Sequence, residues 1–220
     1  MEDKLLELVL EAKRRRSVPG QPFPELEIRF GQQDQQSQRF TAGLAKETAS
    51  ILCTALINGS FWEKTCEWER SHVFLFTLPR TGQLVRTETI FTPTGIRTST
   101  VEKEKVGNCS FCLSDTLPHL MARKEPTVKK TSLSLPCARV ALAVEKPITS
   151  SDLPPTVRPE KVFVKHRRIF VLASEGFGPV WEYSVTRRWG GNTGRLDDVY
   201  ATGLNDDCAV LELEIECVNP

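Results

Sequence analysis

The chain has 220 residues, of which 40% are hydrophobic and 26% are charged, and its net charge is +1. These values are typical of one globular domain with its own core, and they exclude a chain whose overall charge would by itself attract nucleic acid or a membrane surface. No apolar stretch approaches the roughly 20 residues that a membrane span needs, so we expect no membrane partner. The seven cysteines follow no disulfide framework, which predicts reduced thiols in an intracellular protein.

Two helices are predicted in the first quarter of the chain. Apolar residues recur at helical spacing over residues 3–16. These are Leu5, Leu6, Val9 and Leu10. A second helix is expected from Thr41, which could cap it, to Asn58, where Asn58-Gly59 is a suitable stop.

Residues 25–31, between these helices, alternate charged and apolar side chains. Successive side chains of a strand point to opposite faces, so Glu25, Glu27 and Arg29 share one face. Near the other end of the chain, residues 209–218 repeat this pattern. Their charged face carries Glu212, Glu214 and Glu216.

From residue 61 onward, short apolar segments alternate with turn residues, as in antiparallel strands. The predicted strands cover residues 61–70, 72–78, 83–91, 96–106, 109–114, 127–133, 137–146, 161–173, 179–189 and 208–218. Because no long helix separates them, we expect a mainly β fold: a closed antiparallel barrel of eight to ten strands with a few flanking helices. Residues 1–220 would form one domain, with residues 1–20 as an N-terminal helix and linker.

The two acidic strands allow two interpretations. Each alone could be an amphipathic strand that shows its acids to water. A closed barrel, however, can bring its first and last strands side by side, and the carboxylates would then share one lumen. Such crowding needs a divalent cation, and magnesium or manganese would leave positions for water and for a substrate phosphate. For the two strands together, we favour the metal site.

Three of the later strands carry basic residues that could complement this acidic lumen. Lys165 and Arg167 share a face of one strand, Arg139 and Glu145 share a face of another, and Arg86 lies in an apolar strand. Solvated charges on an edge strand are the alternative for each strand taken alone.

Three motifs in this order resemble the triphosphate tunnel metalloenzymes. They are Glu25-Leu-Glu27-Ile-Arg29-Phe30-Gly31, Lys165-His-Arg167 and Glu212-Leu-Glu214-Ile-Glu216. Within this family the chain is similar to the yeast-like mRNA 5'-triphosphatases of fungi, protozoa and large DNA viruses, and its compact form looks like the protozoan, for example trypanosomatid, enzymes. The resemblance implies a nuclear hydrolase that removes the γ-phosphate from 5'-triphosphate RNA in the first step of mRNA capping. It also implies NTP hydrolysis with manganese and an RNA guanylyltransferase as a possible partner.

The same resemblance implies roles for individual residues. Glu25, Glu27 and Glu216 would ligate Mg²⁺ or Mn²⁺ directly, while Glu212 and Glu214 would complete the metal site by holding water or neighbouring basic groups. The residues implied to contact phosphate are Arg86, Lys103 or Lys105, Arg139, Lys165, Arg167 and Arg187. Glu145 would orient the attacking water. The catalytic group would be Glu145, Arg86, Lys165, Arg167 and Glu214.

One strand departs from the family pattern. The family has an arginine and an aspartate at alternating positions before a threonine, whereas here Glu182 and Ser184 precede Thr186. The resemblance therefore assigns no role to Glu182 or Ser184, and Arg187 and Arg188 could compensate.

Two other functions stay open. Other enzymes with this tunnel hydrolyse tripolyphosphate or thiamine triphosphate, but their first motif usually ends in lysine, where this chain has Arg29. A non-catalytic barrel could instead bind single-stranded RNA on aromatic side chains. The candidates for such stacking are Trp62, Trp68, Phe177, Trp181 and Trp189.

Overall fold

A computed structural model describes residues 2–16, 22, 24–34, 36–60, 62–78, 81–112, 134–149, 157–173 and 180–219. The helices are α1 (Glu2–Arg16), α2 (Lys46–Asn58) and α3 (Leu196–Ala201), followed by a 3₁₀ turn over Asp206–Cys208. The first five strands are β1 (Pro24–Asp34), β2 (Phe40–Ala42), β3 (Lys64–Thr65), β4 (Glu69–Thr77) and β5 (Leu84–Thr92). The other five are β6 (Gly95–Cys112), β7 (Ser134–Pro147), β8 (Lys161–Ala173), β9 (Val180–Gly190) and β10 (Val210–Asn219). Among these residues, no helix is long and apolar enough to cross a membrane.

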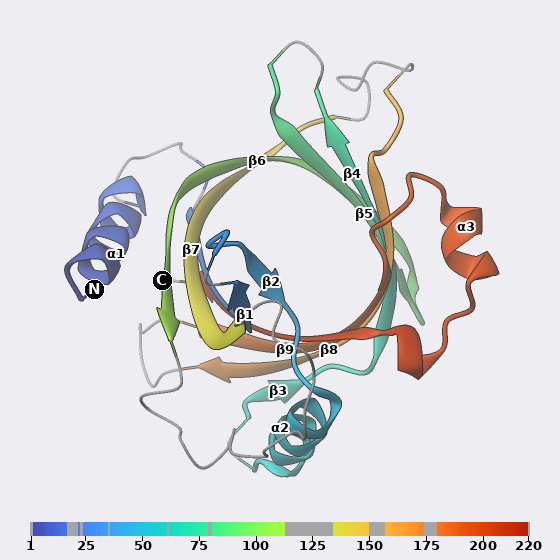
Figure 1. Ribbon diagram of the computed structural model, residues 1–220, viewed down its shortest axis with the longest axis horizontal. Helices are drawn as coiled ribbons and strands as arrows, with labels where there is room; N and C mark the ends of the chain where they lie inside the picture. Colours follow the sequence, from blue (N-terminus) through green and yellow to red (C-terminus); the bar gives the residue numbers. More distant parts are fainter. Residues whose placement is uncertain are drawn as a thin grey trace.

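Eight of the strands form a closed antiparallel barrel, as predicted (Figure 1). Their order is β10-β9-β8-β4-β5-β6-β7-β1, and pairing of β1 with β10 closes the circle. In this pair Glu27 lies opposite Glu216, and Arg29 lies opposite Glu214. Closure therefore makes the two acidic strands direct neighbours, although they lie at opposite ends of the chain.

The hydrophobic clusters lie mainly outside the barrel wall, under the helices that surround it in Figure 1. The cluster beneath α1 contains Leu8, Ala12, Cys109, Val140 and Leu142. The cluster beneath α3 contains Val162, Val164, Trp189 and Val199, and the cluster beside α2 contains Phe170, Val185 and Leu213. Because apolar side chains pack on the outer face, strand alternation leaves the inner face free for polar side chains.

Helix α1 was predicted at the right place, but its buried face was predicted wrongly. Leu8 and Ala12 are buried, and Leu5 packs beside them. Leu6, Val9 and Leu10 are instead 57%, 42% and 55% exposed. Leu5, Leu8 and Ala12, at positions i, i+3 and i+7, thus face the barrel. The prediction had instead placed the adjacent residues Leu6, Val9 and Leu10 on the apolar face.

The second helix begins later than predicted, and Thr41 does not cap it. Thr41 belongs to the short strand β2, which pairs with β1 so that Gly31 lies opposite Ala42. Gly43, at a φ of +143°, then redirects the chain, Leu44 bridges to Leu211, and α2 begins at Lys46. The non-local pairing with β1 and β10 outweighs the local capping signal of Thr41.

Most predicted strands are confirmed with small shifts, three predicted segments differ, and a fourth is not described. The segments 96–106 and 109–114 form one strand, β6, which an irregularity between Lys105 and Gly107 allows to continue. The segment 61–70 contains β3 and the start of β4. The predicted strand 127–133 lies outside the described residues.

Gly31 allows β2 to fold back onto β1. A Cβ atom at Gly31 would lie 2.2 Å from the Thr41 carbonyl oxygen and 2.9 Å from the Phe40 Cζ atom. The carbonyl belongs to a paired backbone, so it cannot simply move aside. β2 thus depends on the missing side chain.

We therefore expect Gly31→Ala to lower the free energy of unfolding by about 1–3 kcal/mol, the usual cost of overpacking. Urea unfolding measures this change. Gln32→Ala is the matched control, because Gln32 is exposed on the same strand and should change stability by no more than about 0.5 kcal/mol. Equal stability of the two variants would contradict the account of Gly31.

Candidate active site

The lumen contains a cavity of about 640 Å³, a size typical of ligand sites. Its lining carries nine basic and three acidic residues. The basic residues are Arg29, Arg39, Arg86, Lys103, Lys105, Arg139, Lys161, Lys165 and Arg188, and the acidic residues are Glu25, Glu27 and Glu212. Such an excess of positive charge in a low-dielectric space attracts a compact polyanion.

The glutamates of β1 and β10 face this lumen. Glu25, Glu27 and Glu212 line the cavity, and Glu27 is only 7% exposed. Glu214 and Glu216 share the inner face of β10 with Glu212 because they alternate with Leu213 and Ile215. The arrangement matches the interpretation in which the acids of both strands share one space.

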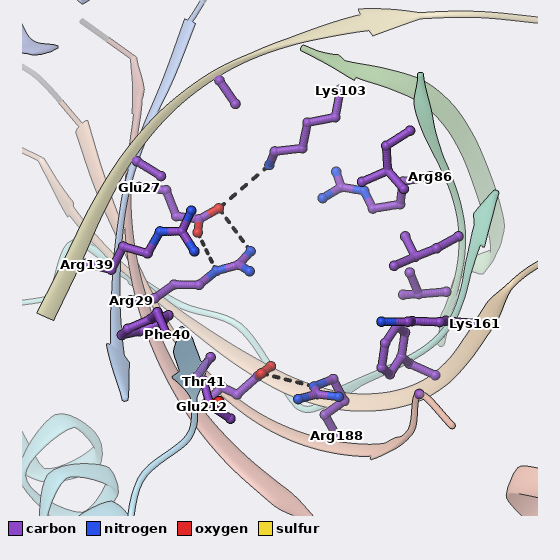
Figure 2. Close-up of a pocket in the computed structure, with 18 of the residues that line it drawn as sticks. Glu27, Arg29, Phe40, Thr41, Arg86, Lys103, Arg139, Lys161, Arg188 and Glu212 are labelled. Carbon is purple, nitrogen blue, oxygen red and sulfur yellow. Dashed lines mark hydrogen bonds and ion pairs between the residues drawn. The ribbon is translucent and has the colours of Figure 1, made fainter. Parts of the chain in front are cut away.

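Arg29 holds the two acidic strands together. Its Nη2 donates to Glu27 Oε2 at 3.0 Å and to Glu214 Oε1 at 3.2 Å, and its Nε forms a further ion pair with Glu27. Figure 2 shows the contacts between Arg29 and Glu27 on one side of the cavity, across from Arg86 and Lys161. Part of the acidic charge is thus already neutralised by the chain itself.

A second network surrounds Lys103. Its Nζ lies 3.2 Å from Glu145 Oε1, 3.4 Å from Glu25 Oε2 and 3.7 Å from Glu27 Oε2. The Nη2 of Arg86 donates to Glu145 Oε2 at 2.8 Å. Glu145 is therefore held between two cations. Lys105 also lines the cavity, but it is exposed, so Lys103 is the more deeply placed of the two lysines.

On β8, Lys165 lines the cavity and Arg167 follows on the same face, with its Nη2 4.0 Å from Glu69 Oε2. Beside them, Glu88 is a buried acid that sequence reasoning did not select. It accepts a hydrogen bond from Ser71 Oγ at 2.8 Å. Burial by itself would raise the pKa of Glu88, but Lys165 and Arg167 outweigh it and hold this pKa below the ordinary value.

Arg187, which was predicted to contact phosphate, lies on the outer wall and does not line the cavity. Its Nη1 is 3.6 Å from Asp206 Oδ2, and its guanidinium lies over the Trp68 ring. Arg188 faces the lumen instead and donates from Nε to Glu212 Oε1 at 2.9 Å. Thr186 lies opposite Glu212, so strand alternation brings Arg188, and not Arg187, to the inner face.

Other cavity residues were also missed. The alternation of β8 could have identified Lys161, which is in phase with Lys165. Arg39 had no such signal, because it reaches the cavity only through the fold of β2. Glu182 lies opposite Glu216, and the buried Ser184 lies opposite Glu214, so the two residues left without a role adjoin the acidic strand.

Three of the four tryptophans proposed as stacking platforms serve as packing residues. Trp62 packs against Phe170 and Tyr183, and Trp189 is buried beneath α3. Trp68 contacts His166 on the outer wall. Phe177 lies outside the described residues. None of these tryptophans lines the cavity.

Crowding changes the proton affinities of the glutamates. Burial raises the pKa of Glu25, Glu27 and Glu216 to about 7, and neighbouring glutamates add to this rise. Burial also acts on Glu214, but Arg29 and Lys165 outweigh it and lower the pKa of Glu214 to about 2. Of these two neighbours, Glu27 is therefore the one that takes up a proton first as pH falls, while Glu214 stays ionised.

The donor set fits a hard divalent cation, because it consists of carboxylate oxygens that repel one another. Among the described residues, no three acidic, histidine or cysteine side chains already form a ligand cluster. The ion pairs of Arg29 and Lys103 separate the carboxylates. A cation would thus compete with these two side chains for the glutamates.

A closed antiparallel barrel with this topology is the fold of the tunnel triphosphatases. Two structures of the Pct1 RNA triphosphatase from S. pombe match at 12% identity, with TM-scores of 0.59 and, in complex with the Spt5 CTD, 0.61. They cover 99% and 100% of this chain, and 79% and 80% of their own. The Mimivirus capping enzyme triphosphatase matches with a TM-score of 0.55 at 10% identity, over 100% of this chain and 89% of its own. No protein-family model and no curated protein matches the sequence. At such identities the likeness shows the fold alone.

The raised pKa values predict how the metal-free protein responds to pH. Unfolded glutamates have a pKa of roughly 4.3. Between this value and about 7, the folded state keeps protons that the unfolded state releases. The stabilisation is complete below the unfolded pKa and is lost as pH rises through 7. We expect a loss on the order of a few kcal/mol from pH 5 to 8, measured by thermal unfolding in EDTA.

Glu216→Gln is the control, because it removes one of these titrations and should flatten the pH dependence. Burial lowers the pKa of His72 and His166, and these groups act in the opposite direction. The difference between wild type and variant cancels their contribution. Identical slopes would contradict the crowding of the glutamates.

Arg188 and Arg187 form a matched pair for testing which face binds anions. We expect Arg188→Ala to weaken binding of inorganic tripolyphosphate by roughly 10- to 150-fold, as for loss of a hydrogen bond to a charged group. Arg187→Ala should bind like wild type, because its side chain lies outside. Calorimetric titration measures both affinities, and a larger loss for Arg187→Ala would refute the assignment.

Proposed function

We propose that the protein is a metal-dependent polynucleotide 5'-phosphatase that hydrolyses the γ-phosphate of 5'-triphosphate RNA, the first step of mRNA capping. The observation that carries this proposal is the closed lumen in which nine basic residues surround a cluster of glutamates. The solved structures of the same fold are described as an RNA triphosphatase and a capping enzyme triphosphatase, which supports this choice among phosphate reactions.

The basic side chains would hold the triphosphate and offset its charge during the reaction. Hydrolysis of a terminal phosphate mainly requires that the attacking water is positioned in line and that cations surround the phosphoryl group being transferred. Arg86, Lys165 and Arg167 would meet the γ-phosphate. Lys103, Lys105, Arg139 and Arg188 extend the same positive wall.

Mg²⁺ or Mn²⁺ would be held by Glu25, Glu27, Glu212, Glu214 and Glu216. When bound, such a cation would offset charge on the phosphate oxygens. The chain would prepare for it by keeping Glu214 ionised beside Arg29 and Lys165, and Glu27 would have to be deprotonated to contribute its oxygens.

Glu145 would orient the attacking water. Its two oxygens are held by Arg86 and Lys103, which fixes the direction of the carboxylate. The same two cations would contact the triphosphate, so water and phosphate would be aligned by one network.

The proposal extends to the compartment, the partner and the other substrates of the protein. The protein would act in the nucleus with an RNA guanylyltransferase, hydrolyse NTPs when manganese is supplied, and be of the compact protozoan type. A tripolyphosphatase or thiamine triphosphatase is the second candidate, because the positive cavity would accept the triphosphate group of these substrates too.

The test is release of phosphate from γ-labelled 5'-triphosphate RNA by the full chain with Mg²⁺ or Mn²⁺. We expect wild-type activity that EDTA abolishes, and a loss of about 100-fold or more in Glu27→Ala and Glu214→Ala. Glu47→Ala, at an exposed position of α2, is the control and should behave as wild type. Full activity in the lumen variants would refute the enzyme, and a large preference for tripolyphosphate over RNA would favour the second candidate.

A further inference from the structure

Strand β2 places an aromatic ring in the cavity. Phe40 lines the cavity together with its neighbours Arg39 and Thr41. The ring lies across Gly31, because a Cβ there would come within 2.9 Å of Phe40 Cζ. An aromatic side chain that covers a glycine on the next strand is a stable feature of β-sheets. The ring is therefore held by paired backbone.

Arg139 lies beside this ring. Its guanidinium carbon is 5.6 Å from the ring centroid, and its buried Nε has no hydrogen-bond partner among the described residues. Other cavity cations, such as Arg29 and Arg188, pair with carboxylates. Figure 2 shows Arg139 and Phe40 on the same side of the cavity, near Arg29.

The phenyl ring of Phe40 suits a base better than a phosphate, and the guanidinium of Arg139 can contact either group. A triphosphate presents only charged oxygens, for which a phenyl ring offers no partner. A nucleobase presents a flat π-face, and both phenyl rings and guanidinium planes stack on such faces. The ring adjoins the positive wall, so a triphosphate and the base that it carries could occupy one cavity.

We propose that Phe40 and Arg139 form a stacking site for the base of the 5'-terminal nucleotide. This inference rests on the proposed function and narrows it, because the site would favour nucleotide triphosphates over inorganic tripolyphosphate. Stacking tolerates every base, so RNAs that begin with any of the four bases should be substrates. The contact is present before and during the reaction, so its loss should raise KM more than it lowers kcat.

The experiment compares kcat/KM for 5'-triphosphate RNA with that for tripolyphosphate. In Phe40→Ala we expect the ratio of the two values to fall by roughly 5- to 150-fold, the range for loss of one stacked base. Phe40→Tyr keeps the ring and should keep the ratio. Phe40→Leu keeps most of the side-chain volume but has no π-face. The ratio should therefore fall in Phe40→Leu as well, which keeps the test valid even if Phe40→Ala folds poorly. Gln32→Ala, exposed on the adjacent strand, is the control.

A second substrate, a 5'-triphosphate RNA whose first nucleotide lacks its base, completes a double-mutant cycle between the ring and the base. Wild type and Phe40→Leu should hydrolyse it at equal kcat/KM, because the proposed partner of the ring is missing. An unchanged ratio in Phe40→Leu, or an equal loss for the abasic RNA, would overturn the stacking site while leaving the proposed function intact. Failure of wild type to hydrolyse any triphosphate would overturn both.

Discussion

The structure depends on the pairing of β1 with β10. This contact closes the barrel and places Glu27 opposite Glu216 and Arg29 opposite Glu214. Buried like charges are costly, and burial weakens the ability of water to screen them. The chain offsets this cost with cations from other strands, and Arg29 and Lys103 link the glutamates directly. The same arrangement that makes closure expensive makes the lumen a site for ions.

The position of the hydrophobic clusters makes this arrangement possible. Small barrels usually fill their interior with apolar side chains, which would leave no room for a charged cavity. Here α1, α2 and α3 cover the outer wall and bury its apolar face. Burial outside the barrel thus supplies stability, and the inner face remains available for chemistry.

β2 adds a second kind of surface to the charged cavity. It occupies the edge of β1 beyond the segment that pairs with β10, and its residues Phe40 and Thr41 line the cavity. Without a side chain at Gly31, the two strands can approach closely, and the ring of Phe40 occupies the space that a side chain would take. A charged lumen recognises phosphates, whereas a ring recognises the group attached to them.

The run of strands without intervening long helices predicted an antiparallel barrel from the sequence by itself. The sequence also determined which side chains share a face of each strand, because side-chain alternation is a local property of the backbone. It sufficed to group Glu25 with Glu27, and Lys165 with Arg167. The same rule, carried from Thr186, would have selected Arg188 instead of Arg187. Only the tertiary structure decided which strands are neighbours, that Lys103 bridges Glu25 and Glu145, and that Phe40 and Arg39 reach the cavity. These features arise from strand pairs that are distant in sequence. Alternation along one strand shows which side chains share a face and so disfavours a one-residue slip in register, but it does not identify the partner strand.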